Sequence, residues 1–274
     1  MNGLRVIAIA GGKGGVGKTQ LAVNLAVSLA QLDERVLLID GDVGLANADL
    51  LLDVAPEAGL GDVVRGLVPI EEALVETPHG PTLLAGRGFD ARPGEALEQR
   101  EALALLGAFD AIGERFDMVV IDTPAGLGPN ALFFAGAADE VLLVTTPEPT
   151  ALADTYATAR ALLLRSSRTR IGLVVNQALS ADIARAVHQR LDDLVARFLG
   201  ARLELVGWVP FDPMVHDAVM RRAPVVRARP SSPAARQLAA LAARLRDLRV
   251  SAPGEGRADL RFFWGRLHAS APPR

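Results

Sequence analysis

The chain has 274 residues, of which 50% are apolar and 22% charged, with a net charge of −3, a composition that excludes a mainly disordered protein. Because it contains no cysteine, disulfides, thiolate zinc sites and cysteine-ligated iron–sulfur clusters are excluded as well. No apolar run approaches the ~20 residues of a transmembrane helix, and no signal-peptide pattern precedes the first strand, so we expect a cytoplasmic protein.

Short apolar runs alternate with helical patterns along almost the whole chain. Strands are predicted at residues 4–10, 35–40, 82–85, 118–122, 140–145, 171–176 and 203–209. Helical patterns occupy residues 21–32, 95–114, 149–165, 180–199 and 231–249. The strands are apolar without alternation, as expected when both faces of a sheet are covered. We therefore predict an α/β fold, a doubly wound and mostly parallel sheet with helices on both faces.

The first predicted strand leads into a phosphate-binding pattern. Residues 12–19, GKGGVGKT, match G-x-x-x-x-G-K-[ST] directly between a strand and a helix. In such a loop the backbone N–H groups and the helix N-terminus face the phosphates. Lys18 would reach the β- and γ-phosphates, and the Thr19 hydroxyl would bind Mg²⁺. The residues expected to contact the nucleotide here are Gly12, Lys13, Gly14, Gly15, Val16, Gly17, Lys18, Thr19 and Gln20.

Two later strands end in acidic residues. Asp40 ends the strand at 35–40 and is followed by Gly41 and Asp42, whereas Asp122 ends the strand at 118–122. In an α/β sheet the ligand lies at the carboxyl ends of the strands, where phosphoryl transfer needs acceptors for water and Mg²⁺. Asp42 and Asp122 are therefore candidate site residues. The alternative for Asp40 and Asp42 is that they only cap and solvate the strand end.

The phosphate loop contains the only two lysines of the chain, Lys13 and Lys18. The additional Lys13 makes the loop resemble the deviant Walker A signature, K-G-G-x-G-K-[ST], of the MinD/ParA ATPases. This resemblance implies a P-loop ATPase that forms a homodimer with ATP, in which Lys13 reaches the partner's nucleotide. It implies that Lys13, Lys18 and Asp42 are catalytic, with Asp42 positioning the attacking water. It also implies that Thr19, Asp42 and Asp122 surround Mg²⁺.

Further matches to the same family concern the base and the ribose. Asn176 resembles the adenine-reading asparagine of these ATPases, although on the residues alone it could equally be a helix N-cap. Residues 207–212 resemble the family's G-x-[IV]-P-x-D stretch, which implies that Pro210, Phe211 and Asp212 flank the adenine. The resemblance also implies that Glu148 touches the ribose bound by the partner subunit.

Within the family, the segments at residues 44–49, 60–66 and 147–150 resemble the flagellar-number regulators FlhG and FleN. The implied function is a slowly hydrolysing ATP switch that regulates flagellar number or placement. Its partners would be a flagellar GTPase of the FlhF kind or a transcription activator of the FleQ kind. One alternative is a ParA-like ATPase that partitions DNA or another cargo, and another is a small-molecule kinase or ligase.

The carboxyl end of the chain differs in composition from the rest. We expect a single ATPase domain at residues 1–250, a linker at 251–256 and an amphipathic tail at 257–274. Residues 221–274 hold twelve arginines and three acidic residues, which predicts a partner or surface of opposite charge, whereas the acidic remainder argues against general nucleic-acid binding. One helical face of the tail would bind an anionic membrane, placing the protein at the inner membrane face, or would dock on the domain itself. The apolar residues of that face are Leu260, Phe263, Trp264 and Leu267.

Overall fold

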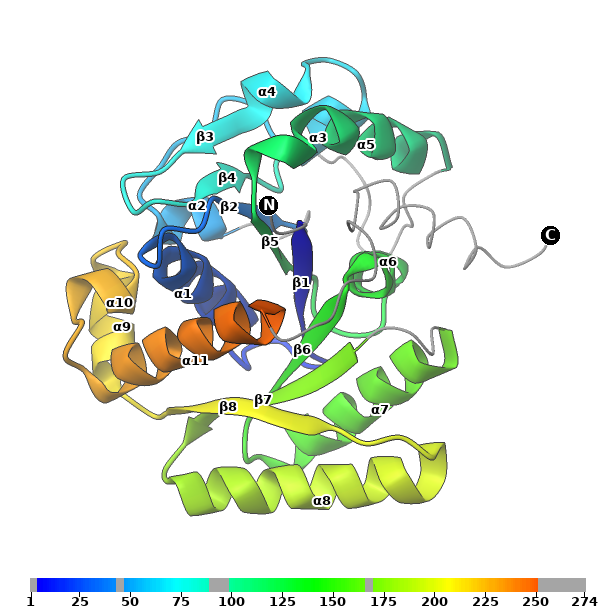
Figure 1. The fold of residues 1–274 in the computed structure, drawn as a ribbon, viewed down its shortest axis with the longest axis vertical. Helices are drawn as coiled ribbons and strands as arrows, with labels where there is room; N and C mark the ends of the chain where they lie inside the picture. Colours follow the sequence, from blue (N-terminus) through cyan, green and yellow to red (C-terminus); the bar gives the residue numbers. More distant parts are fainter. Residues whose placement is uncertain (1–3, 43–46, 89–98, 166–169, 251–274) are drawn as a thin grey trace.

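The computed structural model describes residues 4–42, 47–88, 99–165 and 170–250 (Figure 1). Its strands are β1 (Arg5–Ala10), β2 (Val36–Asp40), β3 (Leu74–Glu76), β4 (Thr82–Leu84), β5 (Met118–Asp122), β6 (Glu140–Thr145), β7 (Arg170–Ala178) and β8 (Glu204–Pro210). Its helices are α1 (Lys18–Ala30), α2 (Ala48–Leu51), α3 (Leu60–Val64), α4 (Ile70–Ala73), α5 (Gln99–Ile112), the 3₁₀ turn η1 (Gly113–Arg115), α6 (Pro129–Ala137), α7 (Pro149–Arg165), α8 (Ala181–Leu199), α9 (Pro213–Met220), α10 (Val225–Ala228) and α11 (Pro233–Val250).

The strands form one eight-stranded sheet in the order β3-β4-β2-β5-β1-β6-β7-β8. Every neighbouring pair is parallel except β3 with β4 at the edge. The chain builds outward from β1 in both directions, which confirms the predicted doubly wound fold. The phosphate loop follows the central strand, so it lies at the switch point where this fold class binds its ligands.

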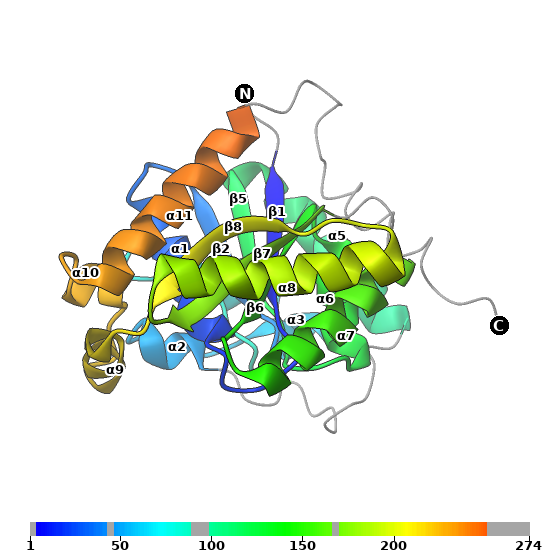
Figure 2. The same ribbon diagram turned by 90° about the horizontal axis from the view of Figure 1, so that it is seen from below.

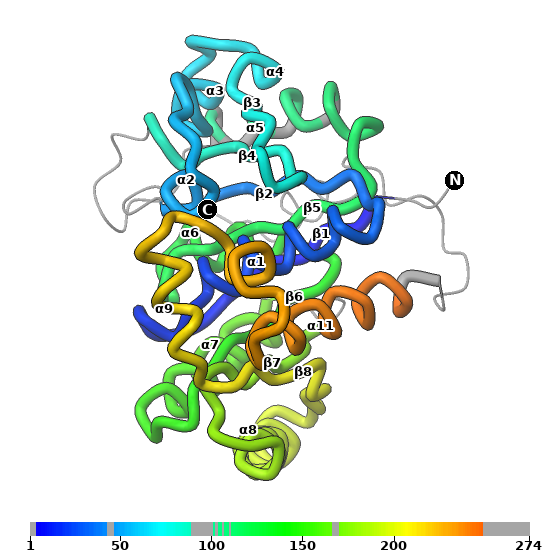
Figure 3. Tube along the Cα trace, turned by 90° about the vertical axis from the view of Figure 1, so that its left-hand side faces the viewer, coloured from blue at the N-terminus to red at the C-terminus, as the bar shows by residue number. Residues whose placement is uncertain are grey.

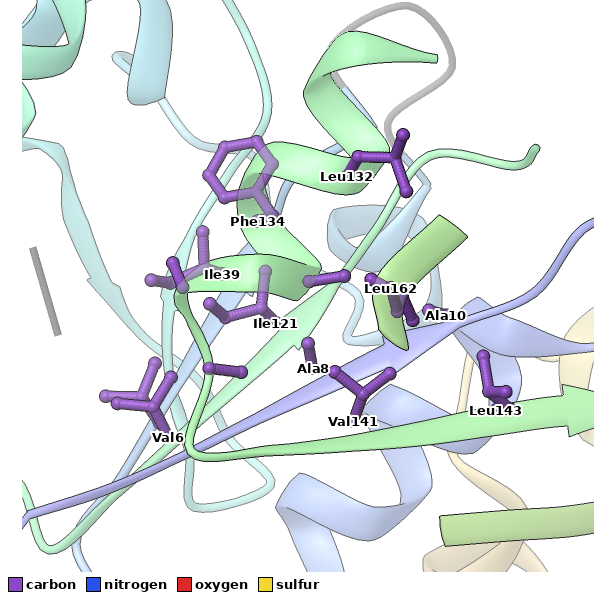
Figure 4. Close-up of a cluster of buried hydrophobic side chains, with 14 of the residues drawn as sticks. Val6, Ala8, Ala10, Ile39, Ile121, Leu132, Phe134, Val141, Leu143 and Leu162 are labelled. Carbon is purple, nitrogen blue, oxygen red and sulfur yellow. The ribbon is translucent and has the colours of Figure 1, made fainter. Parts of the chain in front are cut away.

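Two apolar layers cover the sheet. Along β1, Val6 and Ala8 face a core that includes side chains from α5, α6, α7 and α8 (Figure 4). Ile7 and Ile9 face the other core, to which α1, α10 and α11 contribute (Figure 2). Helices α1 and α11 pack against each other over that second face (Figure 3). Both sides of β1 are thus buried, which explains why its sequence shows no alternation.

Several short elements lack a sequence signal and were not predicted. Strand β3 has three residues, none fully buried, and α2, α3, α4 and α10 have four or five residues, too few to show a period. Helix α6 was missed for another reason. It is apolar nearly all round, so it has no amphipathic stripe. The predicted linker and tail, residues 251–274, lie outside the described residues.

None of the helices in the described part of the chain combines the length and the apolar composition that a membrane crossing requires.

Candidate nucleotide-binding site

The phosphate loop lies between β1 and α1 and has the conformation that the glycine pattern predicts. Gly15 and Gly17 have φ values of 82° and 93°, in the left-handed region where side chains are strained. Gly17 is also the N-cap of α1, and it offers no side chain to the first N–H groups of that helix. A helix start with uncapped N–H groups is suited to an anion such as phosphate.

Lys18 is the first residue of α1 and is buried, with its side chain turned under the loop. Its ammonium lies 3.5 Å from the carbonyl oxygen of Lys13. Burial lowers the pKa of Lys18, while the charges of Asp122 and Asp42 oppose this shift. The structure therefore brings Lys18, Asp42 and Asp122 to one place, as predicted for the γ-phosphate and its Mg²⁺.

Lys13 is directed away from Lys18, onto the start of α7. Its ammonium lies 3.0 Å from Glu148 Oε2 and 3.1 Å from Thr150 Oγ1. The side chains of Lys13 and Glu148 are 41% and 63% exposed, and ion pairs at such exposure contribute ~0–1 kcal/mol. The family resemblance implied contacts across a dimer for both Lys13 and Glu148, whereas here they contact each other within one chain. Their ion pair is weak enough to be replaced by other contacts.

Asp40 and Asp122 lie side by side because β2 and β5 pair with these residues in register. Asp40 accepts hydrogen bonds from the backbone N–H groups of Asp42, Asn47 and Ala48, at 3.1, 3.0 and 3.1 Å. It thus accepts from the N–H groups at the start of α2, but it is buried, which does not fit the alternative that it only caps and solvates the strand end. Burial raises the pKa of Asp40 to about 6, although these hydrogen bonds act to lower it.

Asp122 is buried beside the phosphate loop, and its Oδ1 has no hydrogen-bond partner. Burial and the neighbouring Asp40 raise the pKa of Asp122 to about 7, although a hydrogen bond from the Thr19 side chain to the carboxyl group acts to lower it. A buried carboxylate oxygen and a hydroxyl at a phosphate loop are hard oxygen donors that fit Mg²⁺. No group of three or more acidic, histidine or cysteine residues in the described chain forms a metal cage.

A pocket of about 250 Å³ opens beside Gly17, between the ends of β7 and β8 and helices α1 and α9. The predicted base-contacting residues that line it are Asn176, Pro210, Phe211 and Asp212, and Gln20, predicted with the phosphate loop, lines it as well. The alternative that Asn176 caps a helix is wrong, because Ser180 caps α8 by accepting from the N–H of Ile183. The pocket therefore provides a place for a base next to the phosphate loop.

Two features of the pocket were not predicted. Gln177 lines it, although the strand was expected to end at residue 176. The side chains of α9 that line it are Val215, His216 and Val219. Their helix was not predicted, because it begins at Pro213 and has only eight residues. Only the chain path after β8, which places α9 next to α10, brings them to the site.

Comparison with known proteins agrees with this geometry. Residues 4–163 match the sequence model of a family described as an AAA domain. Over 268 residues the chain is 38% identical to the antiactivator FleN of Pseudomonas aeruginosa, covering 97% of this chain and 94% of that protein. Over 190 residues it is 32% identical to the flagellum site-determining protein YlxH of Helicobacter pylori, covering 68% of this chain and 63% of that protein.

Solved structures of MinD share the fold. The cell division ATPase MinD of Pyrococcus furiosus has a TM-score of 0.72 and 29% identity, covering 89% of this chain and 99% of that chain. MinD of Pyrococcus horikoshii, complexed with Mg-ADP, has a TM-score of 0.73 and 27% identity, covering 92% of this chain and 100% of that chain. The chain belongs to the MinD/ParA family of P-loop ATPases. Within that family it groups with FleN and FlhG.

In this MinD/ParA ATPase, Asp212 joins two helices. Its Oδ1 accepts from the N–H of Met214 at 2.9 Å, capping α9, and its Oδ2 accepts from the N–H of Ala234 at 3.0 Å, near the start of α11. Burial would raise the pKa of Asp212, but the Ala234 and Met214 donors hold it below its ordinary value.

Replacing Asp212 by alanine is expected to lower the free energy of unfolding by about 1–3 kcal/mol, because the N-cap of α9 and the bond to α11 are lost together. Asp182→Ala is a suitable control, since Asp182 is exposed and pairs with the exposed Arg185 one turn further along α8. Urea denaturation measures both variants. Equal stability of the two would contradict the capping role.

The acidic pair of this MinD/ParA site predicts a pH dependence. Asp40 and Asp122 keep their protons to about pH 6 and 7 in the folded protein, but lose them near pH 3.8 when unfolded. Between these limits the folded state binds more protons, so without Mg²⁺ stability falls as pH rises, by on the order of a few kcal/mol. Thermal melts in EDTA at about pH 5.5 and pH 8 measure it. The stability of the Asp122→Asn protein should fall less between these two pH values than that of the wild type, and an equal fall would contradict the prediction.

Proposed function

We propose that this ATPase is a molecular switch, in which ATP joins two copies of the chain and slow hydrolysis releases them. The observation that carries this proposal is the position of Lys13. Its ammonium lies at the surface with Glu148 and Thr150, while the buried Lys18 serves the chain's own loop. A second lysine that is not needed by its own loop is available to a nucleotide held by another copy.

The chemistry within each subunit would use four side chains. Lys18 would neutralise charge on the β- and γ-phosphates, and Thr19 and Asp122 would hold Mg²⁺, which stabilises the charge of the transferring phosphoryl group when bound. Asp42, at the end of β2, would orient the water that attacks the γ-phosphorus. The bond between that phosphorus and the bridging oxygen of ADP then breaks, giving ADP and phosphate.

The surface around Lys13 is suited to a second copy. An added Cβ at Gly14 or at Gly15 would meet no atom within 4 Å, so this part of the loop is open. Leu50, directly after residues 44–49, and Leu127, in the loop after β5, are 49% and 45% exposed. The Lys13–Glu148 contact is weak enough to be replaced by contacts with the partner's nucleotide.

Molar mass in solution tests the switch. The wild type should be a monomer with ADP and a dimer with ATP and Mg²⁺, whereas Lys13→Gln should stay a monomer with either nucleotide. Arg185→Gln is the matched control, because it removes one exposed charge from the Arg185–Asp182 pair on α8. A Lys13→Gln protein that dimerises with ATP like the wild type would contradict the proposal.

We infer that the switch regulates the number or placement of flagella. The relatives named as the antiactivator FleN and the flagellum site-determining protein YlxH support this role. The regulated partners would be an FlhF-like GTPase or a FleQ-like transcription activator, in line with the solved complex of MinC with MinD from Aquifex aeolicus. Affinity capture of such a partner should need ATP and be lost in Lys13→Gln, and capture independent of nucleotide would contradict it.

A ParA-like role in partitioning DNA has one observation in its favour. Arginines gather around α9, α10 and the start of α11, where Asp217 pairs with both Arg221 and Arg229, while Arg222 and Arg227 are exposed. ATP-dependent binding to DNA that weakens steeply with salt would support this function over the flagellar one.

We also propose that the tail, residues 257–274, adds contact with an anionic membrane, following the linker at residues 251–256. Co-sedimentation with anionic vesicles in the presence of ATP tests it. The full chain should sediment and a chain ending at Val250 should not, while equal sedimentation of both would contradict membrane binding by the tail.

A further inference from the structure

The pocket beside Gly17 has an exposed mouth and a buried inner end. Gln177, Phe211 and His216 are exposed and line the mouth. The lining residues at the inner end are at most 4% exposed, and they are Leu21, Asn24, Val225 and Leu238. Asn24 is the polar member of this buried set. A buried carboxamide is costly unless its donors and its acceptor are paired, so the partners of Asn24 indicate what it does there.

Asn24 is paired at both ends of its carboxamide. Its Oδ1 accepts from the N–H of Val226, 202 residues further along the chain, at 3.2 Å. Its Nδ2 donates to the carbonyl oxygen of Gln20 at 2.8 Å and lies 3.4 Å from Gln20 Oε1. Gln20 and Val225, the neighbour of Val226, both line the pocket. One buried side chain of α1 thus holds residues on two walls of the pocket.

The contact with Val226 matters because α10 has no cap of its own. This helix has four residues, too few to be stable alone, and its N-cap residue, Pro224, has no side-chain acceptor. Val226 is the second residue of α10, a position whose N–H an N-cap side chain would normally accept. Asn24 supplies that acceptor from α1, which α10 contacts in the fold (Figure 1). The position of Val225 in the pocket wall therefore depends on Asn24.

We propose that Asn24 is a positioning residue for nucleotide binding, which shapes the inner end of the base pocket by holding α10 against α1. The inference rests on the proposed binding of ATP at this site. Asn24 acts through Gln20 and Val225 and need not touch the base itself. The phosphate loop precedes α1 and forms its site with its own backbone, so Asn24 should matter for the base and not for the phosphates.

Asn24→Leu tests this role, since leucine has a similar size but neither a donor nor an acceptor. The variant should bind Mg-ATP about tenfold more weakly than the wild type, because Val226 and Gln20 lose their common partner. Its affinity for inorganic tripolyphosphate with Mg²⁺ should stay within about twofold, since that ligand has phosphates for the loop but no base for the pocket. Isothermal titration calorimetry on the full chain measures both affinities.

Ser28→Ala is the matched control. Ser28 lies one turn after Asn24 on α1, is 2% exposed, and its hydroxyl has no hydrogen-bond partner among the described residues. Its removal should leave both affinities within about twofold of the wild type. If Asn24→Leu weakened ATP and tripolyphosphate equally, the effect would be a general one on the fold and the proposal would be overturned. Unchanged binding of ATP by Asn24→Leu would overturn it as well.

A second measurement uses the wild type alone and does not depend on any variant folding. A base that fills the pocket stabilises the arrangement of its walls, so the backbone N–H of Val226 should exchange with water at least about tenfold more slowly with Mg-ATP than with Mg-tripolyphosphate. Equal exchange with the two ligands would overturn the proposal. Failure of the wild type to bind ATP would instead overturn the proposed use of ATP.

Discussion

The Lys18→Ala protein is expected to lose nucleotide binding, with affinity for Mg-ATP reduced by at least about thirtyfold. Lys18 is buried at the start of α1, next to the loop that would hold the phosphates. Removing a buried partner of a charged ligand costs about 2–5 kcal/mol, and every 1.4 kcal/mol is a factor of about ten in affinity. Titration with a fluorescent ATP analogue measures the loss.

Lys18→Arg separates the shape of the cation from its charge. The planar guanidinium cannot occupy the space of a compact ammonium in a buried phosphate site, so we expect a loss almost as large as for alanine. Burial lowers the pKa of Lys18 because desolvation disfavours its charged form. The alanine variant does not bury this charge, so we do not expect it to be less stable than the wild type. A folded Lys18→Ala protein that binds Mg-ATP within about threefold of the wild type would contradict the assigned role.

The Asp42→Ala protein is expected to bind ATP nearly as well as the wild type while hydrolysing it about a hundredfold or more slowly. The loss follows from removing the group that orients the attacking water. The backbone N–H of Asp42 donates to Asp40, and alanine keeps that bond, so the end of β2 should stay in place. Phosphate release in single-turnover experiments measures the rate, and light scattering should show an ATP dimer that persists.

Asp49→Ala is the control for Asp42→Ala. Asp49 lies in the first turn of α2, and its carboxylate accepts from the N–H of Leu50. Its removal should leave turnover within about threefold of the wild type. If Asp42→Ala hydrolysed ATP at the wild-type rate, the water-positioning role would be wrong. If it bound ATP but stayed monomeric, the proposed dimer would fail separately.

The sequence was sufficient where function depends on consecutive residues. The glycines of residues 12–17 and the adjoining Lys18 and Thr19 form a site through their own backbone, so the pattern alone predicted where they lie. The sheet was also predictable, because strands buried on both faces are apolar throughout and stand out from their surroundings. Strand β3 and helices α2, α3 and α4 were missed because they contain too few residues to show a period.

Only the tertiary structure decided how distant residues meet. The register of β2 with β5 sets Asp40 beside Asp122. Burial raises the pKa of both carboxyl groups, and Asp40 adds to the shift of Asp122, which neither strand could show alone.

Near the end of β7, where its pairing with β8 is irregular, the N–H of Gln177 donates to the side chain of Asn176. The fold also brings the carboxylate of Asp212 between α9 and α11. Local sequence determines backbone conformation over a few residues. The partner of a hydrogen bond or of a buried charge, however, is set by the packing of segments far apart in the chain. The sequence by itself therefore determined the phosphate loop, whereas the tertiary structure decided the surroundings of the acidic pair and of the base pocket.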